Sequence, residues 1–311
     1  MLAALAGGVG AARFLRGLVR VVPPHDVTAI VNVADDEEFH GLHVSPDLDS
    51  VTYTLAGASD DVQGWGLAGE TFTVLDALDR FDVPTWFRLG DRDLATHLFR
   101  TVRLRAGEPL SAVTAQVAAA FAVRTRLLPV TDDRVSTRIA VEGPSGTVEL
   151  AMQEWFVRDR ARPAVRAVRF EGASDALPAP GVLEALRTAT AVIVCPSNPV
   201  ISIDPILAIP GVREALRTRR DRVVGISPIV GGAPVKGPAD KLMRPLGIDV
   251  SCVGVAAHYA DFCGTFVIDA TDADRRAEVE EQGVRAVVTD TIMQSPEIAA
   301  ALAERALHAV A

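Results

Sequence analysis

The sequence predicts an α/β fold, in which a Rossmann-like, mainly parallel β-sheet carries an inserted and mostly helical region. Three observations lead to this prediction: an apolar opening that runs into a glycine-rich turn, an alternation of strand-like and helix-like segments, and a more polar middle. We expect the 311 residues to form a single domain. Its sheet core covers about residues 1–60 and 165–311, and the inserted region of helices and small strands covers about residues 61–164.

The chain opens with MLAALAGGVGAARFLRGL, which we interpret as a buried strand at residues 1–6, a tight GGVG turn and a helix from Ala11. Phe14, Leu15 and Leu18 give that helix an apolar face. A secretory leader is the alternative, but no Lys or Arg precedes the apolar run, and glycines interrupt it. Glycines in such a turn let the backbone approach an anion at the amino end of a helix, although a lone glycine turn is often only structural.

The remaining segments continue the α/β alternation. In the core we expect further strands at residues 27–33, 191–195, 222–226, 250–255, 266–268 and 285–288, and helices at 181–188, 212–219 and 296–309. In the inserted region we expect helices and turns over 51–103 and a helix at 109–122. Strands are expected there at 124–130, 136–141 and 147–152, with a GPSG turn between the last two.

Composition narrows the class of protein. The net charge of −9 argues against nucleic acid as a partner, because basic surfaces are what bind phosphate backbones. No uncharged apolar stretch reaches the roughly 18–20 residues that a membrane helix needs, so we expect no membrane partner. The three cysteines form no close pair, which argues against a disulfide framework, and we expect a cytoplasmic protein. Lysine occurs only at Lys236 and Lys241, both in one glycine-rich segment.

Four of the expected loops have the composition of a binding site. In parallel sheets, ligands bind in the loops that follow the carboxyl ends of the strands. Four strands are followed by loops rich in Gly, Pro, Ser, Asn or Asp, namely GGVG, NVADDEEFHGLHVSPDLDS, PSNPVISIDP and SPIVGGAPVKGPADKL. Because all four should open on one edge of the sheet, we expect the functional site at that edge.

The acidic loop after the second strand has two interpretations. Asp35, Asp36, Asp47 and Asp49 could bind magnesium, because a hard cation prefers carboxylate oxygens, or one carboxylate could act as a general base. Alternatively, the two aspartates of PDLD cap the helix that follows. The two glutamates of the loop are expected to be solvated.

The segment RLGDRDLATHLF also has two interpretations. Arg88 and Arg92 flank a Gly-Asp turn, and the planar fork of a guanidinium suits phosphate recognition. Surface ion pairs along a helix are the structural alternative. His97 is expected to pack within its helix, and core packing is also the commoner use of the three tryptophans: Trp65, Trp86 and Trp155.

The two remaining loops could hold phosphate. The SPIVGGAPVKGPADKL segment would offer backbone amides near Gly232 and a cation from Lys236, although it is not a Walker A sequence. Ser197 and Asn198 in PSNP could hydrogen-bond a base or a phosphate, or could form an ordinary turn that caps the next helix.

Together these loops resemble a known family. GGVGAARFLRGL, NVADDEEFHGLHVSPDLDSVTYTLAG, WFRLGDRDLATHLFRT, CPSNPVISIDPILAIPGVREAL and SPIVGGAPVKGPADKLM occur in this order. With them the chain is similar, nearly end to end, to the 2-phospho-L-lactate transferase family of coenzyme F420 biosynthesis. The motifs are specific as a set, whereas GGVG alone is not. The resemblance implies a single transferase domain that acts on substituted phosphate groups, depends on Mg²⁺ and forms a homodimer.

The implied reaction joins a phosphoenolpyruvyl or 2-phospho-L-lactyl unit to the ribityl hydroxyl of a deazaflavin, 7,8-didemethyl-8-hydroxy-5-deazariboflavin. The unit comes from a guanosine-diphospho donor, GMP is released, and the product is (dehydro) coenzyme F420-0. The sequence leaves open whether the three-carbon unit is lactate, enolpyruvate or glycerate. The alternative function is that of a non-catalytic, nucleotide-sugar-binding regulatory protein on the same fold.

The resemblance also implies roles for individual residues. Asp49 and Arg88 would contact the deazaflavin, with Asp49 as the catalytic residue. Magnesium would be held by Asp35, Asp36 and Asp49, although the extra carboxylates of ADDEEFHG leave open which of them reaches the metal. The nucleotide part of the donor would be bound by seven residues: Gly7, Gly8, Gly10, Ser197, Asn198, Gly232 and Lys236.

Overall fold

The central feature of the computed structural model, which describes residues 1–143 and 146–310, is a parallel β-sheet. Its seven strands lie in the order β14-β13-β10-β9-β1-β2-β5, and every neighbouring pair is parallel. The strands are β1 (Leu2–Ala6), β2 (Val27–Val31), β5 (Arg126–Pro129), β9 (Val192–Val194), β10 (Val223–Ile226), β13 (Thr265–Asp269) and β14 (Arg285–Thr289). The expected Rossmann-like α/β fold is confirmed.

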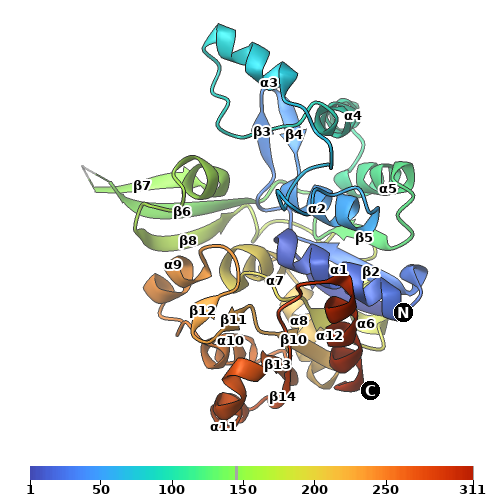
Figure 1. Cartoon of the computed structure of the whole chain (residues 1–311), viewed down its shortest axis with the longest axis vertical. Helices are drawn as coiled ribbons and strands as arrows, with labels where there is room; N and C mark the ends of the chain where they lie inside the picture. Colours follow the sequence, from blue (N-terminus) through green and yellow to red (C-terminus); the bar gives the residue numbers. More distant parts are fainter. Residues whose placement is uncertain (144–145, 311) are drawn as a thin grey trace.

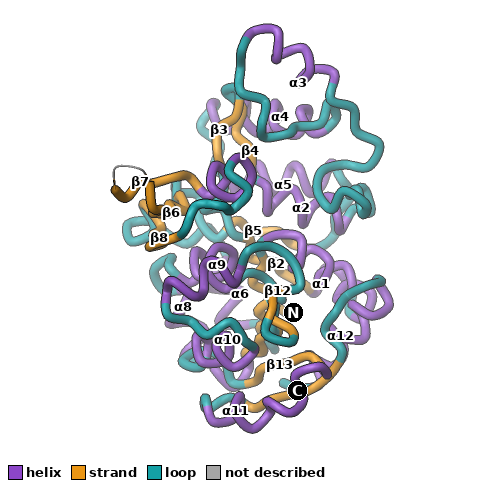
Figure 2. Tube along the Cα trace, turned by 60° about the vertical axis from the view of Figure 1, so that its left-hand side comes forward, coloured by secondary structure: helices purple, strands orange, loops and turns teal. Residues whose placement is uncertain are grey.

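Helices cover both faces of this sheet, and the inner strands are buried along their whole length as a result. Figure 2 shows α1 (Gly8–Val21) and α12 (Pro296–His308) on one side, and α6 (Val182–Thr188) and α8 (Val212–Arg217) on the other. Gly17 lets α1 and α12 pack closely, because a Cβ there would lie 2.3 Å from the carbonyl carbon of Ala299. Further helices of the core are α7 (Asp204–Leu207), α9 (Ala239–Met243), α10 (Cys252–Tyr259) and α11 (Arg276–Glu281).

Two smaller substructures extend from the core (Figure 1). One contains the hairpin of β3 (Glu37–Phe39) and β4 (Leu42–Val44), followed by α2 (Pro46–Leu55), α3 (Thr73–Leu78), α4 (Asp93–Arg105) and α5 (Leu110–Ala120). Phe39 of the hairpin stacks on Phe87 with ring centroids 4.0 Å apart, and Trp86 packs edge-on against both rings. The other is an antiparallel sheet of β6 (Ser136–Gly143), β7 (Gly146–Ala151) and β8 (Val165–Glu171).

The structure corrects two expectations about the elements. The strand expected at residues 250–255 is wrong: this apolar run begins α10, and Ser251 Oγ caps the helix by accepting a hydrogen bond from Gly254 N at 3.0 Å. The strand expected at 124–130 exists, but it pairs with β2 at the edge of the central sheet rather than within the inserted region. The GPSG turn includes residues 144 and 145, which lie outside the described residues. No helix in the described part of the chain has the length and apolar character needed to cross a membrane.

Candidate active site

The glycine turn after β1 is held closely against the loop after β9. A Cβ on Gly10 would lie 2.4 Å from the carbonyl oxygen of Pro196, and a Cβ on Gly7 would lie 2.7 Å from Cβ of Ser202. Gly8 has a φ of 70°, in the left-handed region that favours glycine. Glycine is therefore required because the loop after β9 passes directly over the first turn of α1.

Asn32 joins the loop after β2 to the same place. This side chain is fully buried at the end of β2, and its Nδ2 donates to Asp35 Oδ2 at 3.2 Å and to Asp47 Oδ2 at 3.0 Å. The same nitrogen lies 3.3 Å from the carbonyl oxygen of Ile201 in the loop after β9. Three of the four loops that the sequence brings to one edge thus meet around Asn32 and Gly8. Sequence analysis did not single out Asn32.

Three carboxylates are buried at this meeting point. Burial, with the charge of Asp47, raises the pKa of Asp35 well above its ordinary value. Burial also raises the pKa of Asp36, against hydrogen bonds from His43 and Ser45, and raises that of Asp47 to about 6, against hydrogen bonds from Asn32 and Gly8. Oδ1 of Asp35 and Oδ1 of Asp36 are buried and have no hydrogen-bond partner within residues 1–143 and 146–310. Two buried carboxylate oxygens of the site thus have no partner among the described residues, and burial disfavours the charged form of all three carboxyl groups.

This donor set fits the expected magnesium ion. Oxygen ligands from carboxylates are those that a hard divalent cation prefers, and a bound cation would favour the charged form that burial disfavours. Asp47 does not cap its own helix. Instead, its Oδ1 accepts a hydrogen bond from Gly8 N, at the amino end of α1.

Asp49 takes part in a separate buried network with α4. Both of its oxygens accept hydrogen bonds from the guanidinium of Arg100, which is 2% exposed. His97 Nδ1 lies 3.7 Å from Asp49 Oδ2, and His97 Nε2 lies 3.2 Å from Asp93 Oδ2. The Tyr53 hydroxyl donates to the other oxygen of Asp93. Asp49, Asp93 and His97 could bring ligand atoms within 4.8 Å of one another, but both oxygens of Asp49 already accept hydrogen bonds from Arg100.

The charge of Arg100 is stabilised by its neighbours. Burial opposes that charge, but the carboxylate of Asp49 outweighs the burial and raises the pKa of Arg100. The pKa of Asp93 is lowered for the same kind of reason, since hydrogen bonds from His97 and Tyr53 and the charges of His97 and Arg100 outweigh the burial of its carboxylate. Of the three aspartates expected to bind metal, Asp35 and Asp36 keep an unpartnered oxygen, whereas Asp49 would have to leave Arg100 to do so. The packing expected for His97 is confirmed, since it is 1% exposed.

The two arginines of the Gly-Asp turn lie differently. Arg88 is exposed, with its guanidinium 4.2 Å from the ring centroid of Phe72, so this cation remains accessible to a ligand. Arg92 Nη1 donates to the carbonyl oxygen of Ala68 at 2.6 Å, and its backbone amide donates to Glu70. Arg92 is thereby part of the loop's own structure.

Ser197 and Asn198 both serve the loop after β9. Ser197 Oγ donates to the carbonyl oxygen of Gly7 at 2.8 Å. Asn198 Oδ1 accepts from Val200 N at 3.0 Å and caps the helical turn η4 (Pro199–Ile203). The capping interpretation of PSNP is confirmed, and both residues lie beside the glycine turn.

The fourth loop forms a hairpin, and its two candidate residues, Gly232 and Lys236, lie near different parts of the protein. It consists of β11 (Ile229–Val230) and β12 (Ala233–Pro234), and Gly232 at its tip, with φ 76°, has the carbonyl oxygen of Val250 as its nearest neighbour, 3.9 Å from where a Cβ would stand. Lys236 lies after β12, and its Nζ would be 2.8 Å from a Cβ on Gly64. Partial burial, with the charge of Arg13 on α1, lowers the pKa of Lys236. Lys236 thus faces the glycine-turn helix, whereas Gly232 lies against the segment before α10.

Arg13 is a further cation that sequence analysis missed. Together with Val9, Tyr53 and Trp65, it lines a small cavity of about 20 Å³ between the start of α1, the second half of α2 and the loop after α2. Its position three residues after the glycine turn was the available signal. The other two tryptophans lie elsewhere, Trp155 fully buried in the core and Trp86 in the aromatic cluster of the hairpin.

The fold and this site define a Rossmann-like α/β protein whose polar centre lies at the carboxyl edge of the sheet. The family model described as 2-phospho-L-lactate transferase CofD matches residues 2–305. The chain belongs to this family, and it is therefore an enzyme, a transferase, rather than a non-catalytic regulatory protein.

Individual relatives agree with this assignment. A phosphoenolpyruvate transferase of Streptomyces griseus is 47% identical over 306 residues, which cover 98% of this chain and 96% of the relative. Those of Nocardia farcinica and Mycolicibacterium smegmatis are 42% and 39% identical, cover 97% of this chain, and are matched over 92% and 96% of their own length. A solved structure of a UPF0052-family protein from Bacillus halodurans covers 98% of both chains with a TM-score of 0.63 at 18% identity, and it supports the fold alone.

Proposed function

We propose that this transferase moves a phosphoenolpyruvyl unit from a guanosine-diphospho donor to the ribityl hydroxyl of 7,8-didemethyl-8-hydroxy-5-deazariboflavin, releasing GMP. The family supports a transferase of coenzyme F420 biosynthesis, and the name of the relatives favours phosphoenolpyruvate over 2-phospho-L-lactate. The observation that carries the proposal is the meeting of three loops around Gly8, Asn32 and Asp47. Buried carboxylates there lie beside the amino end of a helix, where a diphosphate binds favourably.

The chemistry needs one bond to form and one to break. The ribityl oxygen attacks the phosphorus that carries the enolpyruvyl group, the bond from that phosphorus to the oxygen of GMP breaks, and GMP leaves with that oxygen. Such transfers depend on in-line positioning and on neutralising the phosphate oxygens. We propose that Asp49, held by Arg100, orients the ribityl hydroxyl and accepts its proton, and that Arg88 contacts the deazaflavin.

The phosphates of the donor would be held mainly at the amino end of α1. We propose that the amides of the glycine turn and the loop with Ser197 and Asn198 bind the guanosine-diphospho part, with Lys236 and Arg13 as cations. Asp35 and Asp36 would hold a magnesium ion, joined by Asp47. When bound, that ion would neutralise negative charge on the phosphate oxygens.

Three donors distinguish the possible three-carbon units. We expect GMP release with the enolpyruvyl donor to have the highest kcat/KM when enolpyruvyl, lactyl and glyceryl donors are compared with the same acceptor and magnesium. Chromatographic quantification of GMP is the measurement. If the lactyl donor is used better, the transferase assignment stays and the enolpyruvyl choice is wrong.

We also propose that the enzyme is a cytoplasmic homodimer that acts on small molecules and not on nucleic acid. The outer face of α4 exposes Leu98, Phe99 and Val102, an apolar stripe that a second copy would cover. Light scattering on the eluting chromatographic peak gives the mass in solution. A monomeric mass at micromolar concentration would contradict the dimer.

A further inference from the structure

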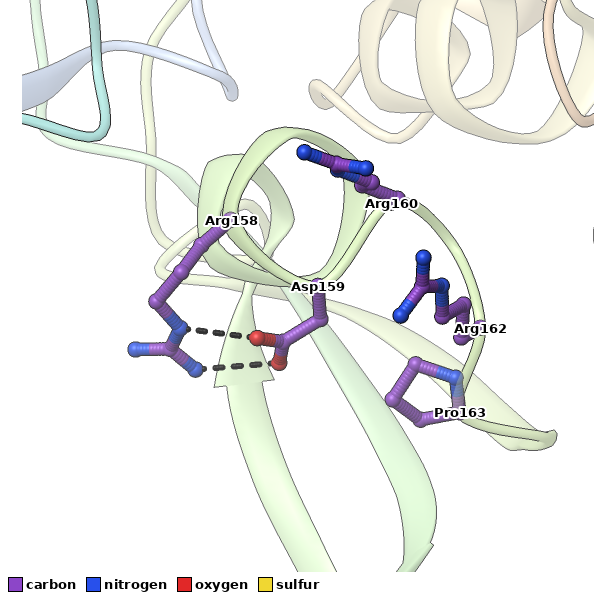
Figure 3. Close-up of a pocket in the computed structure, with 5 residues that line it drawn as sticks. All are labelled: Arg158, Asp159, Arg160, Arg162 and Pro163. Carbon is purple, nitrogen blue, oxygen red and sulfur yellow. Dashed lines mark hydrogen bonds and ion pairs between the residues drawn. The ribbon is translucent and has the colours of Figure 1, made fainter.

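A second polar pocket lies outside the site described above (Figure 3). It is open, has a volume of about 520 Å³, and is lined by Arg158, Asp159, Arg160, Arg162 and Pro163. These residues form the turn between the helical segment η3 (Glu154–Arg158) and β8. Three guanidinium groups around one concave surface are unusual in a chain whose net charge is −9.

The turn that carries these arginines is firmly held. Arg160 and Ala161 have φ values of 56° and 50°, a conformation that non-glycine residues adopt at a cost of ~1–2 kcal/mol each. It is stabilised by hydrogen bonds from Ala161 N to the carbonyl oxygen of Trp155 (2.7 Å) and from Lys241 Nζ to that of Ala161 (2.8 Å). Trp155 Nε1 donates to the carbonyl oxygen of Pro163 at 3.0 Å. The backbone under the guanidiniums is therefore fixed.

Two of the three guanidiniums have no counter-ion in the part of the chain that the structure describes. Arg158 pairs with Glu154 and Asp159, as Figure 3 shows for Asp159. Within the described residues, the side chains of Arg160 and Arg162 make no hydrogen bond and no ion pair. The arginines of the neighbouring antiparallel sheet behave differently, because each is paired with a glutamate: Arg138, Arg166 and Arg169.

The turn that lines the pocket contacts two segments of the proposed active site. The Arg158 guanidinium is 5.9 Å from the ring centroid of Trp86, which stands two residues before Arg88. Lys241, which anchors Ala161, is on α9, five residues after Lys236. The turn thus touches both the segment expected to contact the acceptor and the segment expected to contact the donor.

We propose that Arg160 and Arg162 form an anion-binding site that collects the phosphate-bearing donor at the entrance to the active site. A planar guanidinium matches the geometry of phosphate oxygens, and two unpaired cations next to each other raise the local concentration of an anionic ligand. The rest of the protein is acidic and repels such a ligand. The two arginines therefore raise the rate at which the donor associates with the enzyme. The proposal that the ligand is the donor rests on the proposed function.

Inorganic diphosphate tests the site without any turnover. We expect calorimetry at low ionic strength to give one binding site fewer for Arg160→Gln/Arg162→Gln than for the unaltered protein. The matched control is Arg166→Gln/Arg169→Gln, which removes the same charge from arginines that are already paired with glutamates. Equal stoichiometry and affinity in the two double variants would overturn the site.

Steady-state kinetics test the role toward the donor. At low ionic strength we expect kcat/KM for the donor to fall ~10-fold in Arg160→Gln/Arg162→Gln, with kcat unchanged and a weaker dependence on salt than in the control. If diphosphate binding is lost as expected but no protein releases GMP, the site stands and the proposed function fails. If GMP is released and both double variants have the same kcat/KM, the steering role is wrong.

Discussion

Asp47 Oδ1 accepts a hydrogen bond of 2.8 Å from the backbone amide of Gly8, across 39 residues of sequence. This contact joins the first turn of α2 to the first turn of α1. Asn32 donates to the other oxygen of the same carboxylate at 3.0 Å, so the loops after β1 and β2 form one unit.

The first prediction concerns the close approach at Gly10. In Gly10→Ala, the new Cβ would meet the carbonyl oxygen of Pro196, so we expect a loss of ~1–3 kcal/mol in the free energy of unfolding and much weaker binding of GDP. Gly17→Ala in the same helix should be destabilised similarly, because its Cβ would meet Ala299, but it should bind GDP normally. Urea unfolding and calorimetry give the two quantities. Equal GDP affinities in both variants would contradict a nucleotide site at this turn.

The second prediction concerns the buried pair of Arg100 and Asp49. Arg100→Met leaves the carboxylate of Asp49 buried without its partner, so we expect the free energy of unfolding to fall by ~3–5 kcal/mol. Arg103→Met is the control on the same helix. Its side chain is 41% exposed and pairs with Glu108, so a change below ~1 kcal/mol is expected. Similar losses in the free energy of unfolding of the two variants would show that the buried pair stabilises the fold no more than the exposed pair does.

The third prediction concerns magnesium. Because Asp35 and Asp36 have buried, unpartnered oxygens, we expect MgCl2 to raise the melting temperature, whereas KCl at equal ionic strength should not. Asp35→Asn/Asp36→Asn should melt at the same temperature with and without magnesium. A magnesium-dependent shift that persists in this variant would place the ion elsewhere.

The fourth prediction concerns pH and the carboxylate of Asp269, at the end of β13. Burial opposes the charge of Asp269, but hydrogen bonds from Thr271 and Thr291 outweigh it and hold its pKa below the ordinary 3.8. A depressed pKa stabilises the fold above pH ~4, and this contribution is lost as the pH falls through the folded value. We expect Asp269→Ala to cost ~1–3 kcal/mol at pH 7 and progressively less below pH ~4.

Urea unfolding at pH 7 and pH 3 measures this difference. Asp290→Ala is the matched control, because Asp290 is exposed and accepts one hydrogen bond, from Ile292 N. It should change the stability by a few tenths of a kcal/mol at either pH. A cost of Asp269→Ala that is the same at both pH values would contradict the depressed pKa.

The sequence predicted the sheet well because its strands are short apolar runs separated by turn residues. It failed at residues 250–255, because an apolar run of this length is compatible with a strand or with a buried helix, and only the cap at Ser251 decides between them. It also missed β8, which is mostly exposed or only partly buried and carries three exposed charged residues: Arg166, Arg169 and Glu171. Hydrophobicity alone was thus not enough to identify these two elements.

The candidate site was predicted in its loops but not in its pairings. Gly7, Gly8, Gly10, Ser197 and Asn198 come together as expected from the carboxyl ends of parallel strands. The pairing of Asp49 on α2 with Arg100 on α4 joins residues 51 positions apart, and no local pattern specifies it. The role of Asp47 as a partner of Gly8 likewise depends on how α2 packs against α1.

Mass spectrometry of the acceptor shows whether the enzyme transfers the enolpyruvyl phosphate to the deazaflavin, as we propose. With magnesium and the enolpyruvyl donor, we expect one modified deazaflavin for each GMP released, and a loss of at least ~100-fold in rate for Asp49→Asn. Asp61→Asn, which alters an exposed carboxylate, should retain the full rate. GMP formed while the deazaflavin keeps its mass, or no GMP with any of the three donors, would contradict the account.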